Sequence, residues 1–167
     1  MKWNVRTVGI LIALTIAVGL KLVFAQPPDL KQTVPEELKN TLEHAEIFTL
    51  FSLDPEPNLE AKSETTFKGY PQLGKIQIPA GQERTNLLIA LFDGITNAGW
   101  GAWCFNPRHG IRAKQGSNSI ELVICFECGH IQCSLNNGTS FMLRTTQMPT
   151  ETFNGVLRKA KVPLSKK

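Results

Sequence analysis

The residues most able to do chemistry are crowded into one stretch of the chain. All four cysteines of the 167 residues lie between Cys104 and Cys133, and two of the three histidines lie there as well. Cys125 and Cys128 form a C-x-x-C pair. Thiols and imidazoles form disulfides, bind zinc and carry out thiol exchange. We therefore expect the chemistry of this protein in this stretch.

The first interpretation of the cysteines is a structural disulfide, because the export leader described below places the chain under oxidising conditions. In a straight strand, Cys125 and Cys128 point to opposite faces, with Cα atoms about 10 Å apart. A disulfide spans Cα atoms within about 7 Å, so direct pairing of these two requires a bend. The predicted partner of either one is therefore Cys104, on a neighbouring strand.

Two alternatives use the same side chains. Cys104, His109, Cys125 and Cys128 together make a Cys3His zinc set, although a second C-x-x-C is missing. Thiol redox chemistry is the other alternative, although redox C-x-x-C pairs begin a helix and this pair follows a strand. Free cysteines that pack as small apolar side chains remain a further possibility. The leading interpretation needs no cofactor, and the alternative needs zinc.

The Pro-Arg-His-Gly segment after Cys104 suggests a ligand site. Arg108 and Arg112 can hold a carboxylate or phosphate through forked hydrogen bonds. His109 lies between them as a group that titrates near neutral pH. These three residues are the candidates for an anion-binding module.

A structural explanation of the same segment is favoured. In it, Gly110 supplies a positive φ in a tight loop, and the two arginines pair with Glu121 or Glu127 across the sheet. Nucleophilic catalysis would need Cys104 beside His109 and an orienting acid. The chain does not establish that arrangement. No catalytic residue is assigned, and a non-catalytic role is favoured.

Trp100 and Trp103 flank the start of the cysteine-rich stretch, and Gly99 and Gly101 alternate with them. Aromatic side chains beside glycines can line a ligand surface. Packing in the core or at its rim is the favoured expectation for both tryptophans.

The N-terminus has the layout of an export leader. Lys2 and Arg6 come before or beside an apolar run over residues 8–20, and small residues follow it. This pattern predicts a signal peptide over residues 1–25. The alternative is an uncleaved membrane anchor over residues 8–25, slightly short of the roughly 20 apolar residues that span a bilayer. Both place the domain outside the cytoplasm, either periplasmic or secreted.

The charge balance depends on this leader. It carries three basic residues, so its removal lowers the formal charge from +4 to +1. A nearly neutral chain has no electrostatic basis for binding nucleic acid, and none is predicted. A membrane contact is expected only through residues 8–25, if they are not cleaved. The sequence indicates no partner and no oligomeric state.

The rest of the chain predicts one α+β domain over residues 34–167, after a flexible stalk at 26–33. Helical spacing of apolar residues, strand alternation and turn residues place the elements. We expect a mostly antiparallel sheet of about five to seven strands, with two or three helices packed on one face. The expected helices are 34–45, 82–98 and 149–161. The expected strands are 47–53, 70–78, 102–105, 110–114, 119–128, 131–135 and 140–145.

Two motifs carry a resemblance to known proteins. C-F-N-P-R-H-G-I-R over Cys104–Arg112 and V-I-C-F-E-C over Val123–Cys128 resemble those of a widespread family of small exported bacterial proteins, to which no activity is assigned. The segments F-T-L-F-S-L-D-P and G-Y-P-Q-L-G-K fit the same resemblance. It implies export and a common fold. It covers the first cysteine and the C-x-x-C pair, but not Cys133 or His130.

These observations lead to one functional expectation. The protein is an exported small globular domain with a non-catalytic binding or structural role, stabilised around Cys104, Cys125 and Cys128. A zinc-binding or thiol-redox protein is the alternative, and the anion-binding module is a weaker one.

Overall fold

The computed structural model describes residues 32–57 and 64–166. These described residues belong to one compact unit. The predicted leader at 1–25 and most of the predicted stalk at 26–33 lie outside the described residues, so export and anchoring stay predictions.

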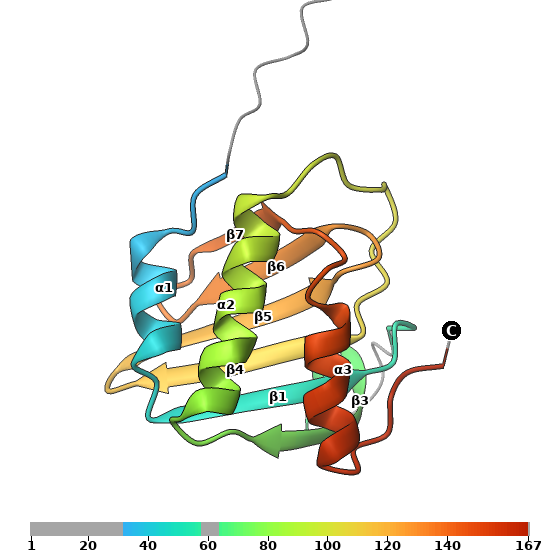
Figure 1. The fold of residues 1–167 in the computed structure, drawn as a ribbon, viewed down its shortest axis with the longest axis horizontal. Helices are drawn as coiled ribbons and strands as arrows, with labels where there is room; N and C mark the ends of the chain where they lie inside the picture. The colour runs from blue at the N-terminus through green and yellow to red at the C-terminus, as the bar shows by residue number, and fades with distance from the viewer. Residues whose placement is uncertain (1–31, 58–63, 167) are drawn as a thin grey trace, which may run out of the picture. The chain divides into compact units, whose positions relative to one another are not determined.

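The described residues form seven strands and three helices, which confirms the predicted α+β class (Figure 1). The helices are α1 (Glu36–Glu43), α2 (Gln82–Thr96) and α3 (Thr150–Lys159). The strands are β1 (Ile47–Leu53), β2 (Thr66–Phe67), β3 (Tyr70–Gln77), β4 (His109–Gln115), β5 (Asn118–Cys125), β6 (His130–Leu135) and β7 (Ser140–Arg144).

The strands form one antiparallel sheet in the order β2-β3-β1-β4-β5-β6-β7. Strands β4 to β7 follow one another as a meander, and β1 pairs with both β3 and β4. All three helices lie against the same face of this sheet (Figure 1). Between β1 and β4 the register places Ser52 opposite His109, which brings two residues far apart in the chain onto neighbouring strands.

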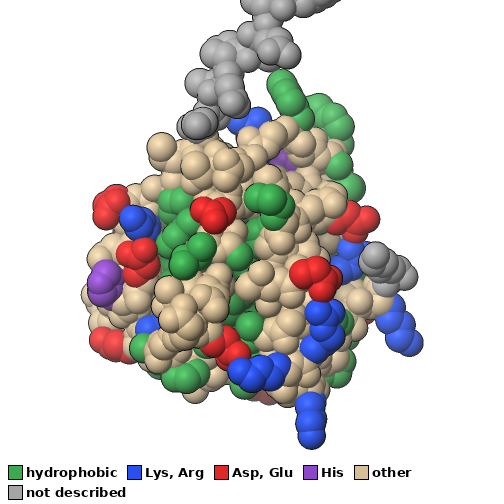
Figure 2. Space-filling view, viewed as in Figure 1, with side chains coloured by type: hydrophobic (Ala, Val, Ile, Leu, Met, Phe, Trp, Pro, Cys, Tyr) green, Lys and Arg blue, Asp and Glu red, His purple; other side chains and the backbone are tan. Residues whose placement is uncertain are grey.

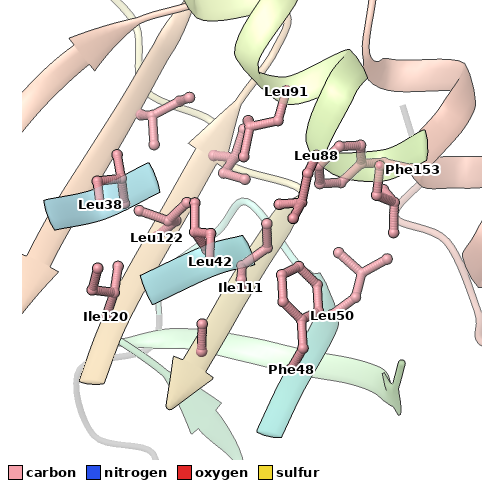
Figure 3. Packing of buried hydrophobic residues seen from close by; sticks show 14 of the residues in the cluster. Leu38, Leu42, Phe48, Leu50, Leu88, Leu91, Ile111, Ile120, Leu122 and Phe153 are labelled. Carbon is pink, nitrogen blue, oxygen red and sulfur yellow. The ribbon is translucent and has the colours of Figure 1, made fainter. Parts of the chain in front are cut away.

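The main core lies between the helices and the sheet. Every second side chain along a strand points into this core, as the alternation along β1 predicts. Figure 3 shows the leucines of α1 and α2 and the phenylalanine of α3 converging on this face of the sheet. Its fully buried residues include Leu38, Leu42, Phe48, Leu50, Leu87, Leu91, Ile111, Leu122 and Phe153.

A second, smaller apolar cluster covers the other face of the sheet. It consists of Phe51, Leu53, Phe67 and Val123, with Tyr70 and Phe105 packed against it. Phe67 belongs to β2, a two-residue strand that the sequence did not predict. Its ring stacks on that of Phe51, with 4.3 Å between the ring centroids.

Gly110 is needed for the packing of this cluster. The expectation that it adopts a positive φ is wrong, because its φ lies outside that range. A Cβ atom at this position would lie 2.7 Å from Cε1 of Phe67. The glycine is therefore a site of close packing between β4 and the Phe67 ring.

Two predicted strands differ from the structure. Residues 102–105 form a loop, because they lie against the chain around Cys128 rather than in the sheet. The strand predicted over 119–128 ends at Cys125, where the chain turns. Both differences bear directly on the cysteines.

Alanine substitutions at two glycines in helices are expected to change the free energy of unfolding in opposite directions. A Cβ atom at Gly94 of α2 would lie 2.7 Å from Pro149 Cγ and from Thr145 Oγ1, whereas one at Gly155 of α3 meets nothing within 4 Å. We expect Gly94→Ala to lower the free energy of unfolding by about 1–3 kcal/mol, through overpacking. We expect Gly155→Ala to raise it by about 0.5–1 kcal/mol, through helix propensity. Urea unfolding measures both, and changes of the same sign would contradict the packing argument.

Candidate functional site: the cysteine turn and the adjacent cavity

The disulfide of the structure joins Cys125 to Cys128. The expectation that Cys104 is the bonded partner is therefore wrong. That expectation assumed a strand running through Cys128. Instead, β5 ends at Cys125 and residues 125–129, the cysteine turn, reverse the chain, with Gly129 at φ 72°. The turn brings the two Cα atoms to 5.2 Å, well within the reach of a disulfide.

Cys104 is a free and exposed thiol, yet it lies beside this disulfide. Its Sγ atom is 3.6 Å from Sγ of Cys128. The backbone around it lies along the cysteine turn, since Ala102 N–H donates to the carbonyl oxygen of Cys128 at 2.9 Å. Asn106 N–H donates to Sγ of Cys128 at 3.2 Å. Three of the four cysteines thus come together, although only two are bonded.

The loop between α2 and β4, residues 97–108, approaches the cysteine turn closely, and Gly101 permits this approach. A Cβ atom at Gly101 would lie 2.7 Å from the carbonyl oxygen of Cys128 and 2.5 Å from Cε1 of His130. At Gly99 the same atom would meet nothing within 4 Å. The alternating glycines therefore have different roles, and only Gly101 places the loop.

The two tryptophans of the loop are not part of the core. Trp100 is 90 % exposed and Trp103 is fully exposed, so the expectation that they pack is wrong. Figure 2 shows apolar side chains projecting from the molecule at the end where this loop lies. The backbone N–H groups of Ala102 and Asn106 in this loop donate hydrogen bonds to Cys128 of the cysteine turn. The side chains of both tryptophans are exposed to solvent instead.

His109 lies on the helix-covered face of the sheet and is 4 % exposed. Its ring packs against Phe126 and Phe153, with centroid separations of 5.3 and 5.6 Å. Nε2 donates a hydrogen bond to Oδ1 of Asn154 at 2.9 Å. Burial lowers the pKa of His109 to about 4; the hydrogen bond to Asn154 raises the pKa, and the nearby positive charge of Arg108 lowers it further. The imidazole is therefore neutral at neutral pH.

The predicted zinc set is not assembled in the structure. His109 is two residues from Ile111 in β4 and so lies on the same face as the main core. Cys125 is two residues from Val123 in β5 and so lies on the opposite face, with the smaller cluster. Cys125 and Cys128 are also bonded to each other. In residues 32–57 and 64–166, no three histidine, cysteine or acidic side chains are grouped to hold a metal ion.

Cys133 stands apart from the other three cysteines. It is fully buried in the main core, and burial raises the pKa of its thiol to about 12. It behaves as a small apolar side chain, which was one of the open interpretations of the cysteines.

Arg108 and Arg112 diverge, so the three-residue anion module is not assembled. Arg108 is ion-paired with Glu127. Arg112 pairs with Glu121 at 2.7 Å, and its guanidinium also lies over Phe67, 5.3 Å from the ring centroid. Both ion pairs agree with the favoured structural explanation of this segment, although only Arg112 and Glu121 face each other across paired strands.

A cavity of about 560 Å³ lies beside α3, at the end of β1 and β4. It brings together Arg108 and His109 from the sequence motif with residues the sequence did not single out. Two buried polar atoms of its lining have no hydrogen-bond partner, Oγ of Ser52 and Nε of Arg108. The lining residues are Ser52, Asn106, Arg108, His109, Phe126, Glu127, Gln147, Thr150, Glu151, Asn154, Arg158, Leu164 and Ser165.

One cavity residue that the sequence analysis did not single out, Ser52, has a recognisable signal in the sequence. On β1, Phe48, Leu50 and Ser52 share the inward face, so the serine is the polar exception on a buried stripe. Asn154 follows the buried Phe153 on an amphipathic helix and is marked by nothing in its pattern. Its role comes from the docking of α3 against β4.

Comparison with known protein families, with curated proteins and with solved structures finds no match. The resemblance to small exported bacterial proteins therefore stays a prediction. Among the helices of the described residues, none is long and apolar enough to cross a membrane.

Proposed function

We propose that the protein is a non-catalytic binding domain that takes a small polar ligand in the cavity beside α3. We also propose that it acts outside the cytoplasm, after export through residues 1–25. The observation that carries the binding role is the pair of unsatisfied polar atoms in the cavity, Ser52 Oγ and Arg108 Nε. A buried polar group without a partner costs about 1–3 kcal/mol. Both atoms are buried behind the surface of the cavity, so a ligand with suitable acceptors satisfies them when the Ser52 hydroxyl and the Arg108 side chain turn towards it.

The size of the cavity supports a small molecule. Its volume of about 560 Å³ lies within the range of roughly 300–1,000 Å³ that is usual for ligand pockets. Phe126 contributes an apolar wall, while Asn154 and His109 contribute polar groups. Most of the other lining side chains are polar as well, which suits a polar ligand.

The charges of the lining favour a neutral or zwitterionic ligand. Arg108 is paired with Glu127, and Arg158 with Glu151 at 2.9 Å, so the positive and negative charges balance. His109 adds no charge, because its pKa is about 4. A strongly anionic ligand would have to displace one of the glutamates from its arginine.

The Cys125–Cys128 disulfide has a structural part in this proposal. It closes the turn that carries Phe126 and Glu127, and both of these residues line the cavity. Locking the turn keeps one wall of the cavity in place before a ligand binds, which lowers the entropy cost of binding.

The test is the Ser52→Ala variant. Removing an unsatisfied hydroxyl should raise the stability of the ligand-free protein by about 1 kcal/mol. It should also weaken binding, because the ligand loses a partner. A panel of free amino acids, small amides and polyols is screened by thermal unfolding of the wild type. A compound at 100 times its Kd raises the free energy of unfolding by about 2.7 kcal/mol.

Ser140→Ala is the matched control, because Ser140 is exposed on β7 and does not line the cavity. The control should respond to each compound as the wild type does, while Ser52→Ala should respond less. The proposal fails if no compound gives a saturable shift with the wild type. It also fails if Ser52→Ala retains the full shift.

A further inference from the structure

We propose that Cys104, Cys128 and Cys125 form a thiol–disulfide exchange centre, in which the exposed Cys104 reacts first with an external disulfide and passes the oxidation to the buried pair. The inference rests on the separation of 3.6 Å between Sγ of Cys104 and Sγ of Cys128. It uses the sulfur atoms alone and is independent of ligand binding in the cavity.

Exposure separates the roles of the three thiols. Cys125 and Cys128 are each 1 % exposed, so an external reagent does not reach them directly. Cys104 is exposed and unbonded. An exposed thiol in contact with a buried C-x-x-C pair is the arrangement in which one cysteine meets the substrate and another resolves the mixed disulfide.

The first step starts from the reduced protein. The Cys104 thiolate attacks one sulfur of an external disulfide. A bond forms between Cys104 and that sulfur, the external S–S bond breaks, and the first external thiol leaves with the electron pair. Cys128, in contact with Cys104, then attacks Sγ of Cys104. The second external thiol leaves, and a Cys104–Cys128 disulfide forms.

In the last step the Cys125 thiolate attacks Sγ of Cys128. The Cys104–Cys128 bond breaks, its electron pair returns to Cys104, and the Cys125–Cys128 disulfide of the structure forms. Over the three steps, two thiols of the protein are oxidised and one external disulfide is reduced to two thiols. Cys104 ends as it began, as a free thiol.

Backbone donors are placed to assist these exchanges. Asn106 N–H donates to Sγ of Cys128 at 3.2 Å, and Cys128 N–H donates to Sγ of Cys125 at 3.0 Å. Hydrogen bonds to a sulfur favour its thiolate, which is both the attacking and the leaving form. The central sulfur and the terminal one are therefore both stabilised when they carry the negative charge.

Oxidised glutathione serves as the external disulfide in the test. The full chain is reduced, mixed with it, quenched with acid at intervals and mapped by peptide mass spectrometry. We expect a glutathione adduct on Cys104 first, and then the Cys125–Cys128 disulfide with Cys104 free. In Cys104→Ser, closure of the disulfide should slow by at least about tenfold, because direct attack on the buried pair waits for a local opening.

Two glycine variants test the geometry while keeping every cysteine. Gly101→Ala pushes the loop away from Cys128 and should slow disulfide closure, while Gly99→Ala, which has open space, should match the wild type. Circular dichroism of each reduced variant checks that the fold is retained. Closure of Cys104→Ser at the wild-type rate, or a first adduct on Cys125 or Cys128, would overturn the proposal.

Discussion

Replacing Phe153 with alanine is expected to lower the free energy of unfolding by about 3–5 kcal/mol, the usual cost of deleting a buried phenylalanine. The side chain is completely buried where α3 meets the sheet (Figure 3). Its ring also makes an edge contact with Phe126, with 4.9 Å between the centroids. Such aromatic pairs add about 0.5–1.5 kcal/mol beyond the area they bury.

Equilibrium unfolding in urea at pH 7 measures this loss. A domain of this size has a total stability of roughly 5–15 kcal/mol, so the alanine variant can be largely unfolded. Phe153→Leu keeps much of the volume and should cost about half as much or less. Phe141→Ala is the control, since Phe141 is only partly buried at the edge of the core. A cost for Phe153→Ala no larger than that of the control would show that α3 does not anchor the helix layer.

The second large effect is a loss of stability in acid caused by His109. Its pKa is about 4 in the folded protein, mainly because burial disfavours the charged imidazole. The pKa of an unfolded histidine is about 6.5. Between these values the unfolded chain binds a proton that the folded chain does not. Stability is therefore complete above pH 6.5, falls as the pH drops towards 4, and loses nothing more from this group below 4.

The size of the loss follows from the shift. One pKa unit corresponds to 1.36 kcal/mol, so the wild type should lose about 3 kcal/mol through His109 between pH 7 and pH 4. Urea unfolding of the wild type and of His109→Gln over this range isolates the contribution, because the carboxylates are common to both. His44 is exposed and also remains in both proteins. Parallel stability curves would contradict a buried neutral imidazole.

Local pattern was enough to predict most of the fold. Alternation along β1 assigned both of its faces correctly, with Phe48 and Leu50 in the main core and Phe51 and Leu53 in the smaller cluster. These assignments succeed because side-chain direction in a strand depends only on neighbours in the chain. β2 was missed, since a two-residue strand is too short to show any period.

The ion pairs of the motif were also predictable. Arg112 faces Glu121 across β4 and β5, and that register is set by the tight turn that joins the two strands. A hairpin converts positions in the sequence into neighbours across the sheet. The expected pairing of the arginines with Glu121 or Glu127 is seen for both, but only Arg112 and Glu121 are register partners; Arg108 and Glu127 lie outside the two strands.

Only the tertiary structure decided which cysteines bond and where the cavity lies. The chain leaves β5 at Cys125 rather than at Cys128, and that difference of three residues makes the C-x-x-C pair the disulfide. Cys104 lies beside this disulfide as a free thiol in contact with Cys128, rather than as its bonded partner. Its place depends on the docking of a loop, which no local period encodes.

The cavity, like the disulfide, was decided by the tertiary structure and not by local sequence patterns. Ser52, His109 and Asn154 come from three distant parts of the chain and meet because β1 pairs with β4 and α3 docks beside them. The sequence by itself determined most of the elements, their inward faces and the concentration of thiols between Cys104 and Cys133. The structure decided which of those residues touch, because contacts between distant segments depend on where strands end and how helices dock.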